Sequence, residues 1–468
     1  MRALPINGGY AIIYEKDGGG VRMIDFRAMT YHDGIDAVEN ALSRLTILRG
    51  EADKGVFGKL KLIMCALEEG NVRTACDGFH AMTALLASQD IRRVSGNIFT
   101  DFILDRLILC DNAFSLMAAR GEADGVLYEA MRSELAILQP LATLDSETLM
   151  DWTRERIRET VKHSPGGPVR DTMSAMASAA WGGAPVKATP PARETAQRQT
   201  LMAEQPWLTW TYERGEMKEQ YVCDEALEEI YARILESGDW RGAIDDIWNF
   251  HASYGSGKFL KSRYFIADGG RLVPMEEAAA PETNLYEEQY NVLVDNAIAF
   301  MRSGRYAHTL ITGGEGTGKT MLAMRVANDL PELRLVVVSE RELGNIGGYI
   351  AEASAQPLRF LFLLDGISPK TAGKYVFSPA LPDNVMMFAT AVEAEASSLF
   401  EQTVNLPYLP IRDYIECVDV ILKRCGAIIE QDTVRSACID AQADTRNKLT
   451  AASANVTANM LMSRNALR

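Results

Sequence analysis

The sequence predicts an α/β chain with a parallel-sheet core and, ahead of it, an all-helical N-terminal domain. From about Arg271 onward, apolar runs without alternation follow one another with helical stretches between them. This pattern is typical of strands that are buried on both faces. Up to about residue 163, apolar side chains instead recur at helical spacing, as at Ile35, Val38 and Leu42. These two apolar patterns distinguish a sheet-containing region from a helical one.

The stretch between these regions differs in composition. After His163 the chain becomes rich in Ala, Pro, Gly, Thr and Ser, which predicts a linker that is flexible or partly extended. Aromatic helices follow it, and a small hairpin around Gly18 is expected before the first helix. We therefore expect a helical N-terminal domain over 1–163, a linker over 164–205, a helical connector over 206–270, the α/β core over 271–410 and a helical lid over 411–468.

Each expected element of the core and lid has its own apolar pattern. Helical spacing at Tyr414 and Val418 indicates the first helix of the lid. The strands expected in the core are His308–Thr312, Leu333–Val338, Phe360–Leu364, Val385–Ala389 and Thr403–Leu406, and the helices open at Met321–Ala327 and near Ile346–Ala355.

The segment between the first of these strands and its helix carries the most specific motif of the chain. Residues 313–320 read Gly-Gly-Glu-Gly-Thr-Gly-Lys-Thr and fit the phosphate-binding pattern G-x-x-x-x-G-K-S/T. Glycines let successive backbone N–H groups turn toward phosphate oxygens, and the helix N-terminus adds partial positive charge. Lys319 would reach the β- and γ-phosphates of ATP, and Thr320 would ligate Mg²⁺. The expected nucleotide-binding residues are Gly313, Gly314, Glu315, Gly316, Thr317, Gly318, Lys319, Thr320 and Met321.

A carboxylate closes the third expected strand. Asp365 directly follows the apolar run Phe360–Leu364, at the end of the strand where ligands of open parallel sheets bind. In phosphate-loop proteins an acid in this position helps to hold Mg²⁺. We therefore expect Thr320 and Asp365 to form the metal site, and we assign no catalytic residue.

The bulk composition narrows the classes of function. The chain has 468 residues, a formal net charge of −15, and 47% hydrophobic and 24% charged residues. These values suit a globular protein and argue against broad binding to nucleic acid or to a membrane surface. The 7 cysteines include no C-x-x-C pair and the 5 histidines lack metal-ligand spacing, so a zinc site is not expected. Without a signal peptide or a long apolar run, a cytoplasmic protein is expected.

From about Trp248 to Met462 the chain resembles predicted bacterial AAA+ ATPases that are catalogued only as a domain of unknown function. The resemblance implies an AAA+-type fold that uses ATP and Mg²⁺, and it implies no particular cellular task. The segments that carry it are Leu272–Pro274, Leu285–Gln289, Asn296–Phe300, the phosphate-binding loop, Leu363–Ser368, Pro382–Val385, Phe388–Thr390 and Arg412–Ile415.

The chain departs from this family at the positions that serve hydrolysis. Gly366 stands where the family has a second acid that orients the attacking water. Val392 stands where the family has an Asn that senses the γ-phosphate, and the arginines that follow it there are absent. The lid stretch Ala451–Asn459 contains no arginine, which leaves Arg446 or Lys448 to contact the nucleotide. Since positioned charges supply most of the catalysis of phosphoryl transfer, slow or absent hydrolysis is expected.

Three functions stay open on the sequence. The favoured one is an ATP-binding, AAA+-like module with weak or lost hydrolysis that contacts a protein partner in a nucleotide-dependent way. The second is an active AAA+ ATPase that remodels a protein partner as an oligomeric ring. The third, a P-loop phosphotransferase, is disfavoured because such enzymes carry clustered arginines in a lid. Enzymatic activity and homo-oligomer formation are thus left open.

Overall fold

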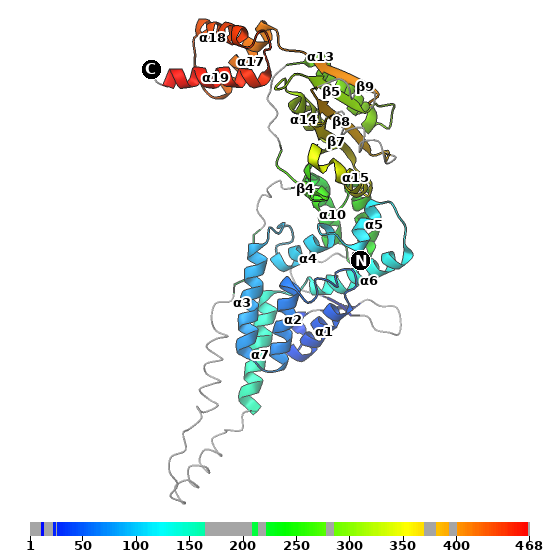
Figure 1. The fold of residues 1–468 in the computed structure, drawn as a ribbon. Helices are drawn as coiled ribbons and strands as arrows, with labels where there is room; N and C mark the ends of the chain where they lie inside the picture. Colours follow the sequence, from blue (N-terminus) through cyan, green and yellow to red (C-terminus); the bar gives the residue numbers. More distant parts are fainter. Residues whose placement is uncertain are drawn as a thin grey trace, which may run out of the picture. The chain divides into compact units, whose positions relative to one another are not determined.

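The computed structural model describes residues 11–13, 22–24, 26–163, 208–213, 221–277, 285–368, 381–392 and 400–466. The chain divides into two compact units, Met1–Ala252 and Ser253–Arg468 (Figure 1). The linker expected over 164–205 lies outside the described residues. None of the helices in the described ranges is long and apolar enough to cross a membrane.

Unit 1 is helical, apart from a short strand pair, in the part that the structure describes. Strands β1 (Ala11–Ile13) and β2 (Arg22–Ile24) pair antiparallel on either side of the Gly18 region, as expected for a hairpin. The helices are α1 (Tyr31–Arg44), α2 (Gly55–Glu68), α3 (Val72–Ser88), α4 (Ile98–Ile108), α5 (Ala113–Ala119), α6 (Gly125–Leu141), α7 (Ser146–His163), α10 (Asp224–Glu236) and α11 (Ile244–Tyr254), with the 3₁₀ turns η1 (Phe26–Ala28) and η2 (Trp240–Ala243).

Residues beyond the expected linker return to unit 1. Trp210 is 1% exposed, its ring stacks on Phe79 with 5.5 Å between the ring centres, and its N–H donates to a buried threonine hydroxyl at 3.0 Å. The Tyr231 hydroxyl donates to the Asp105 carboxylate at 2.7 Å. The connector expected over 206–270 is therefore divided. Its first part completes the core of unit 1, and the remainder belongs to unit 2.

Unit 2 is built on one seven-stranded sheet with the strand order β4-β3-β6-β7-β8-β5-β9. Neighbouring strands are parallel except for the antiparallel pair β3 and β4. The five expected strands are present within two residues of their expected bounds, whereas β3 lies in the range that we expected to be helical. The strands are β3 (Tyr264–Asp268), β4 (Arg271–Pro274), β5 (Thr309–Gly313), β6 (Leu333–Ser339), β7 (Arg359–Asp365), β8 (Val385–Ala391) and β9 (Gln402–Leu406).

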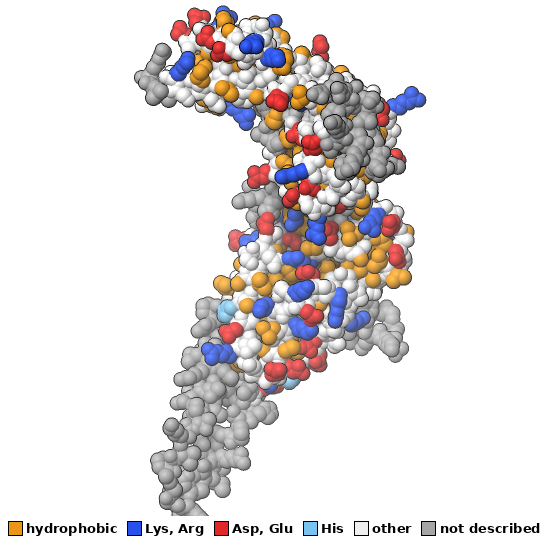
Figure 2. All heavy atoms as spheres, viewed as in Figure 1, with side chains coloured by type: hydrophobic (Ala, Val, Ile, Leu, Met, Phe, Trp, Pro, Cys, Tyr) orange, Lys and Arg blue, Asp and Glu red, His pale blue; other side chains and the backbone are white. Residues whose placement is uncertain are grey.

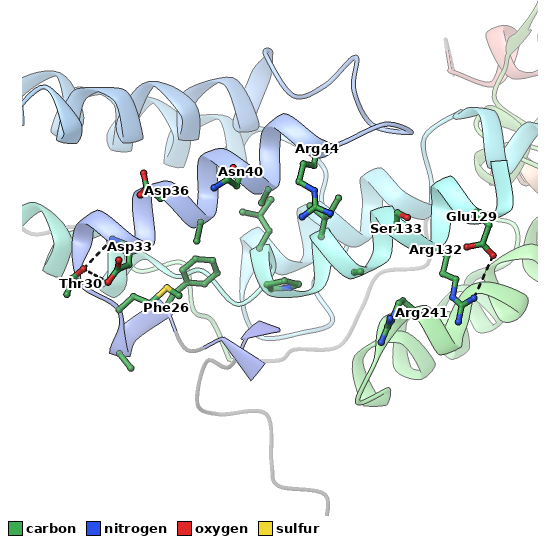
Figure 3. A pocket seen from close by; sticks show the side chains of 18 residues that line it. Phe26, Thr30, Asp33, Asp36, Asn40, Arg44, Glu129, Arg132, Ser133 and Arg241 are labelled. Atoms are coloured by element: carbon green, nitrogen blue, oxygen red, sulfur yellow. Dashed lines mark hydrogen bonds and ion pairs between the residues drawn. The ribbon is translucent and has the colours of Figure 1, made fainter. Parts of the chain in front are cut away.

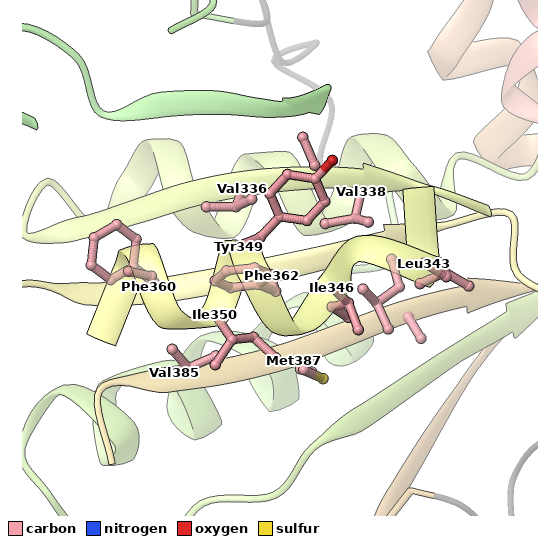
Figure 4. Close-up of a cluster of buried hydrophobic side chains, with 14 of the residues drawn as sticks. Val336, Val338, Leu343, Ile346, Tyr349, Ile350, Phe360, Phe362, Val385 and Met387 are labelled. Carbon is pink, nitrogen blue, oxygen red and sulfur yellow. The ribbon is translucent and has the colours of Figure 1, made fainter. Parts of the chain in front are cut away.

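Helices cover both faces of this sheet. On one face α15 (Ile346–Ser354) packs on the strands, and its Tyr349 and Ile350 contact the cluster that contains Phe360 and Phe362 of β7 (Figure 4). On the other face α13 (Glu287–Met301) and α14 (Lys319–Asp329) pack on the alternate residues of the same strand, including Leu361. The strands are thus buried on both faces, which explains their unbroken apolar runs.

Three helices form a small bundle after the last strand. They are α17 (Ile411–Arg424), α18 (Gln431–Asp444) and α19 (Ala451–Ala466), and they share a hydrophobic cluster that includes Tyr414 and Val418. The backbone N–H of Leu409, ahead of α17, donates to the carbonyl of Leu449 at 2.8 Å. The bundle corresponds to the lid that the sequence predicts.

Candidate functional site

The phosphate-binding motif forms the turn between β5 and α14. The strand ends at Gly313 and the helix begins at Lys319, two residues earlier than expected. Gly316 and Gly318 adopt left-handed backbone conformations, with φ of 76° and 97°. Side chains with a Cβ disfavour this region, so glycine is what allows the chain to turn into the helix here. The buried Thr317 braces the turn, since its hydroxyl donates to the Gly314 carbonyl at 2.9 Å.

Lys319 is folded back over this loop. Its ammonium group donates hydrogen bonds to the carbonyls of Gly313 at 3.0 Å and Gly314 at 2.9 Å. Burial lowers the pKa of Lys319, and the nearby negative charges of Asp365 and Glu315 oppose that shift. The charge of Lys319 is thus held at the loop by backbone carbonyls and two carboxylates.

Asp365, at the end of β7, is tied to the loop and to β8. The Thr320 hydroxyl donates to Asp365 Oδ1 at 2.5 Å, and the Thr390 hydroxyl donates to the same oxygen at 2.8 Å. The Thr390 oxygen in turn accepts the backbone N–H of Gly366 at 2.7 Å. The predicted pair of Thr320 and Asp365 is therefore brought into direct contact.

Sequence reasoning missed the role of Thr390. Strand β8 lies between β7 and β5 in the sheet, so its C-terminal end stands between Asp365 and the loop. Thr390 is 1% exposed and provides a hydroxyl near the end of a strand that is otherwise mostly apolar. That hydroxyl in an apolar run was the available signal, but its partners depend on the strand order.

A cavity of about 450 Å³ opens between the loop and the ends of β7 and β8. Its lining includes one cation, one hydroxyl and two carboxylates from residues that the sequence singled out. The lining residues are Glu315, Gly316, Lys319, Thr320, Asp365, Gly366, Ile367, Ser368, Thr390, Ala391 and Val392. The other expected residues, which are Gly313, Gly314, Thr317, Gly318 and Met321, support the loop or the helix and do not line this cavity.

Gly366 and Val392, the two positions at which the sequence departs from the resemblance, line the cavity just after the ends of β7 and β8. Gly366 has a left-handed φ of 64°, and an added Cβ would meet no heavy atom within 4 Å. A larger residue there would have space but a strained backbone. Val392 is 56% exposed and presents an apolar side chain. These two positions therefore supply neither a second acid nor an amide.

The lid and its connection contact the loop directly. The backbone N–H of Ala452, at the start of α19, donates to the Gly316 carbonyl at 3.0 Å. Tyr408 lies against Gly314, where a Cβ would come within 2.7 Å of its ring. Lys448 has its ammonium nitrogen 5.9 Å from the centre of that ring, and both Lys448 and Arg446 are exposed. Of the two cations considered from sequence, Lys448 is thus the one beside the loop.

Unit 1 carries a larger hollow of about 980 Å³, mainly between α1 and α6 (Figure 3). Its charges are divided between acids such as Asp33 and Asp36 and the basic residues Arg44, Arg132 and Arg241. On the face drawn in Figure 2, basic and acidic side chains are interspersed. The hollow differs from the cavity of unit 2 in having no phosphate-binding loop on its wall.

The match to a protein-family model agrees with the resemblance to a domain of unknown function. Residues 266–376 match the family described as "Protein of unknown function (DUF815)". No curated protein matches the chain. Among solved structures, a point variant of Thermotoga maritima RuvB is 15% identical, with a TM-score of 0.26 and coverage of 37% of this chain and 67% of that chain. The Thermotoga maritima RuvB Holliday junction branch migration motor is 14% identical, with a TM-score of 0.27 and coverage of 38% and 71%.

The fold class rests on the structure of the chain itself. The phosphate-loop strand β5 lies between β8 and β9, the acid-bearing strand β7 is separated from β5 by β8, and a helical lid follows the last strand. Unit 2 thus has an AAA+-like P-loop fold, the described part of the N-terminal region is helical apart from one short strand pair, and residues 266–376 match the family DUF815.

Proposed function

We propose that unit 2 binds ATP together with Mg²⁺ and hydrolyses it slowly or not at all. The observation that carries the proposal is the hydrogen bond between Thr320 and Asp365, which joins the phosphate-binding motif to the acid of β7 at the cavity wall. A loop with left-handed glycines, one ammonium group and this hydroxyl–carboxylate pair fits a triphosphate with its metal ion.

Each of these groups has a role in that proposal. Lys319 would exchange its loop carbonyls for the β- and γ-phosphate oxygens, and the loop N–H groups would hold the remaining phosphate charge. Thr320 and Asp365 would hold Mg²⁺, and Thr390 would keep the Asp365 carboxylate in place through its hydroxyl. When bound, the ion supplies neutralisation of the phosphate charge.

Slow hydrolysis of ATP is expected from the residues that follow β7 and β8. Gly366 offers no carboxylate to orient water, and Val392 offers no polar group to the γ-phosphate. Removing a single preorganised donor from an enzyme typically costs about 10²–10³-fold in rate. Two such absences support a protein that keeps ATP bound without cleaving it rapidly. In this ATP-bound state the chain would contact a protein partner.

Two other functions have distinct signatures. An active AAA+ ATPase that works as a ring would combine fast turnover with an ATP-dependent rise in molar mass. A phosphotransferase would need cations around the transferred group. Among the described residues that line the cavity, Lys319 is the single cation, which disfavours this third function.

The test is a titration of the full-length protein with a fluorescent ATP analogue, with and without Mg²⁺. We expect saturable binding that Lys319→Ala removes. Lys423→Ala is a matched control, because Lys423 lies in α17 of the lid and its side chain is 73% exposed. Equal affinities for the parent and Lys319→Ala would rule out the site.

A further inference from the structure

A further carboxylate, besides Glu315 and Asp365 of the cavity lining, follows directly after the neighbouring strand β6. Strand β6 pairs in parallel with β7, and Ser339 is the register partner of Asp365. Glu340 follows Ser339 at the start of the 3₁₀ turn η3 (Glu340–Asn345). Parallel strands lie about 4.8 Å apart, so Glu340 leaves the sheet next to Gly366.

The side chain of Glu340 turns toward this wall. Its Oε1 accepts a hydrogen bond from the backbone N–H of Ser368 at 3.0 Å, and Ser368 lines the cavity. Glu340 is partly buried, and Leu343 anchors the same turn in the core with no exposed surface. The carboxylate is thus fixed against the backbone of Ser368, a residue that lines the cavity, while Glu340 itself lies just behind the lining residues.

We propose that Glu340 supplies, from β6, the carboxylate that orders water at the γ-phosphate end of this site, the role that Gly366 leaves open on β7. The inference rests on the proposed ATP site. In hydrolysis the water oxygen forms a bond to the γ-phosphorus. The bond between the γ-phosphorus and the bridging oxygen breaks at the same time, and ADP leaves with that oxygen. The proton that water loses passes to the carboxylate and then to the phosphate product.

From this placement we expect slow rather than absent turnover. The acid reaches the cavity from the strand beyond β7, one strand farther from the phosphate-binding loop than Asp365 is. Val392 still adds no polar contact to the γ-phosphate. A carboxylate at this distance would order water less tightly than one at position 366.

The substitution Glu340→Gln separates the charge from the hydrogen bond. The Gln carbonyl can still accept the Ser368 N–H, so a merely structural role would survive, whereas the negative charge is lost. Glu340→Ala removes both. Glu342→Gln is the matched control, because Glu342 lies in the same turn and its carboxylate accepts from the Tyr349 hydroxyl at 2.6 Å.

The readout is the affinity for ADP with aluminium fluoride and Mg²⁺, compared with the affinity for ADP and Mg²⁺ alone. Transition-state analogues bind about 10²-fold or more tightly than ground-state ligands where the site orders the reaction. We expect the full-length protein to prefer the fluoride complex at least about 10-fold, and we expect Glu340→Gln to lose this preference while it keeps its affinity for ADP. Glu342→Gln should behave like the parent.

Three results would overturn the inference. In the first, the parent shows no preference for the fluoride complex although it binds ATP, which leaves the ATP site intact. In the second, Glu340→Gln keeps the preference and only Glu340→Ala loses it, which reduces Glu340 to a support for Ser368. In the third, the parent binds no nucleotide, which overturns the proposed function as well.

Discussion

The two walls of the cavity in unit 2 differ in what they offer a nucleotide. The wall formed by the phosphate-binding loop and the end of β7 presents Lys319, Thr320 and Asp365, joined to one another by hydrogen bonds and charge. The wall formed after β7 and β8 presents Gly366 and Val392, neither of which has a polar side-chain group. Binding a triphosphate needs the first wall, and rapid cleavage needs both. From this contrast we expect the two capacities to be separated in this chain.

The largest expected effect is a loss of ATP affinity on changing the phosphate-binding loop. Lys319→Ala should weaken ATP binding by about 30- to 150-fold, since a hydrogen bond to a charged group contributes about 2–3 kcal/mol. The decrease should appear in a fluorescence titration, with Lys423→Ala unchanged. A loss of less than threefold would mean that the loop does not hold the phosphates.

Thr390→Val should lower the free energy of unfolding of unit 2 by about 1–3 kcal/mol, because it leaves the Gly366 N–H and one lone pair of Asp365 without their hydroxyl partner. Val preserves the shape of the side chain, and Thr390→Ser preserves the hydroxyl. Chemical denaturation of the two variants should therefore separate. Equal stability of the Val and Ser variants would contradict the positioning role of Thr390.

Asp365→Asn should reduce the Mg²⁺-dependent part of ATP affinity by about 10-fold, and it should leave the fold intact. The Asn carbonyl can still accept from Thr320, so the loss reports the charge. Titrations with and without Mg²⁺ measure it. If the parent itself shows no Mg²⁺ dependence, Asp365 is a structural acceptor and not a metal ligand.

The smallest expected effect is at His308, which lies just before β5, at the end of this strand away from the cavity. Burial lowers the pKa of His308, with the nearby Glu401 opposing, and its Nδ1 accepts the N–H of Met387 at 3.2 Å. The unfolded chain therefore takes up a proton near pH 6.5 before the folded chain does, and stability falls as the pH drops below that value.

The substitution His308→Asn keeps an acceptor for Met387 and removes this titration. We expect the loss of unfolding free energy between pH 7 and pH 5 to be smaller in the variant, by up to about 1 kcal/mol. Denaturation curves at the two pH values test this. An identical pH dependence in parent and variant would show that His308 titrates alike in both states.

Much of unit 2 could be predicted from the sequence because its signals are local. A strand, a glycine-rich turn and a helix stand in order around Lys319, and Asp365 ends an apolar run, so both members of the hydrogen-bonded pair Thr320 and Asp365 could be named from the sequence. Thr390 and Glu340 were not, because their contacts depend on β8 lying between β7 and β5 and on β6 lying beside β7. Nothing in the local sequence states that order.

The division of the chain was harder to predict for the same reason. Trp210 follows a stretch of linker-like composition, and its apolar neighbours gave no indication that they belong to the N-terminal helices. The stacking of Trp210 on Phe79 joins residues that are far apart in sequence. Composition alone does not indicate which core receives the chain at Trp210.

The central claim is that the phosphate-binding loop and Asp365 bind ATP although Gly366 and Val392 provide no polar groups for its hydrolysis. The most direct measurement is steady-state ATP hydrolysis by the isolated full-length protein, on the same preparation in which ATP binding has been titrated and beside Lys319→Ala. We predict saturable ATP binding with turnover far below about 1 per second, the lower end of typical enzyme rates. Turnover near or above that rate, lost in Lys319→Ala, would contradict the account and identify the protein as a working ATPase.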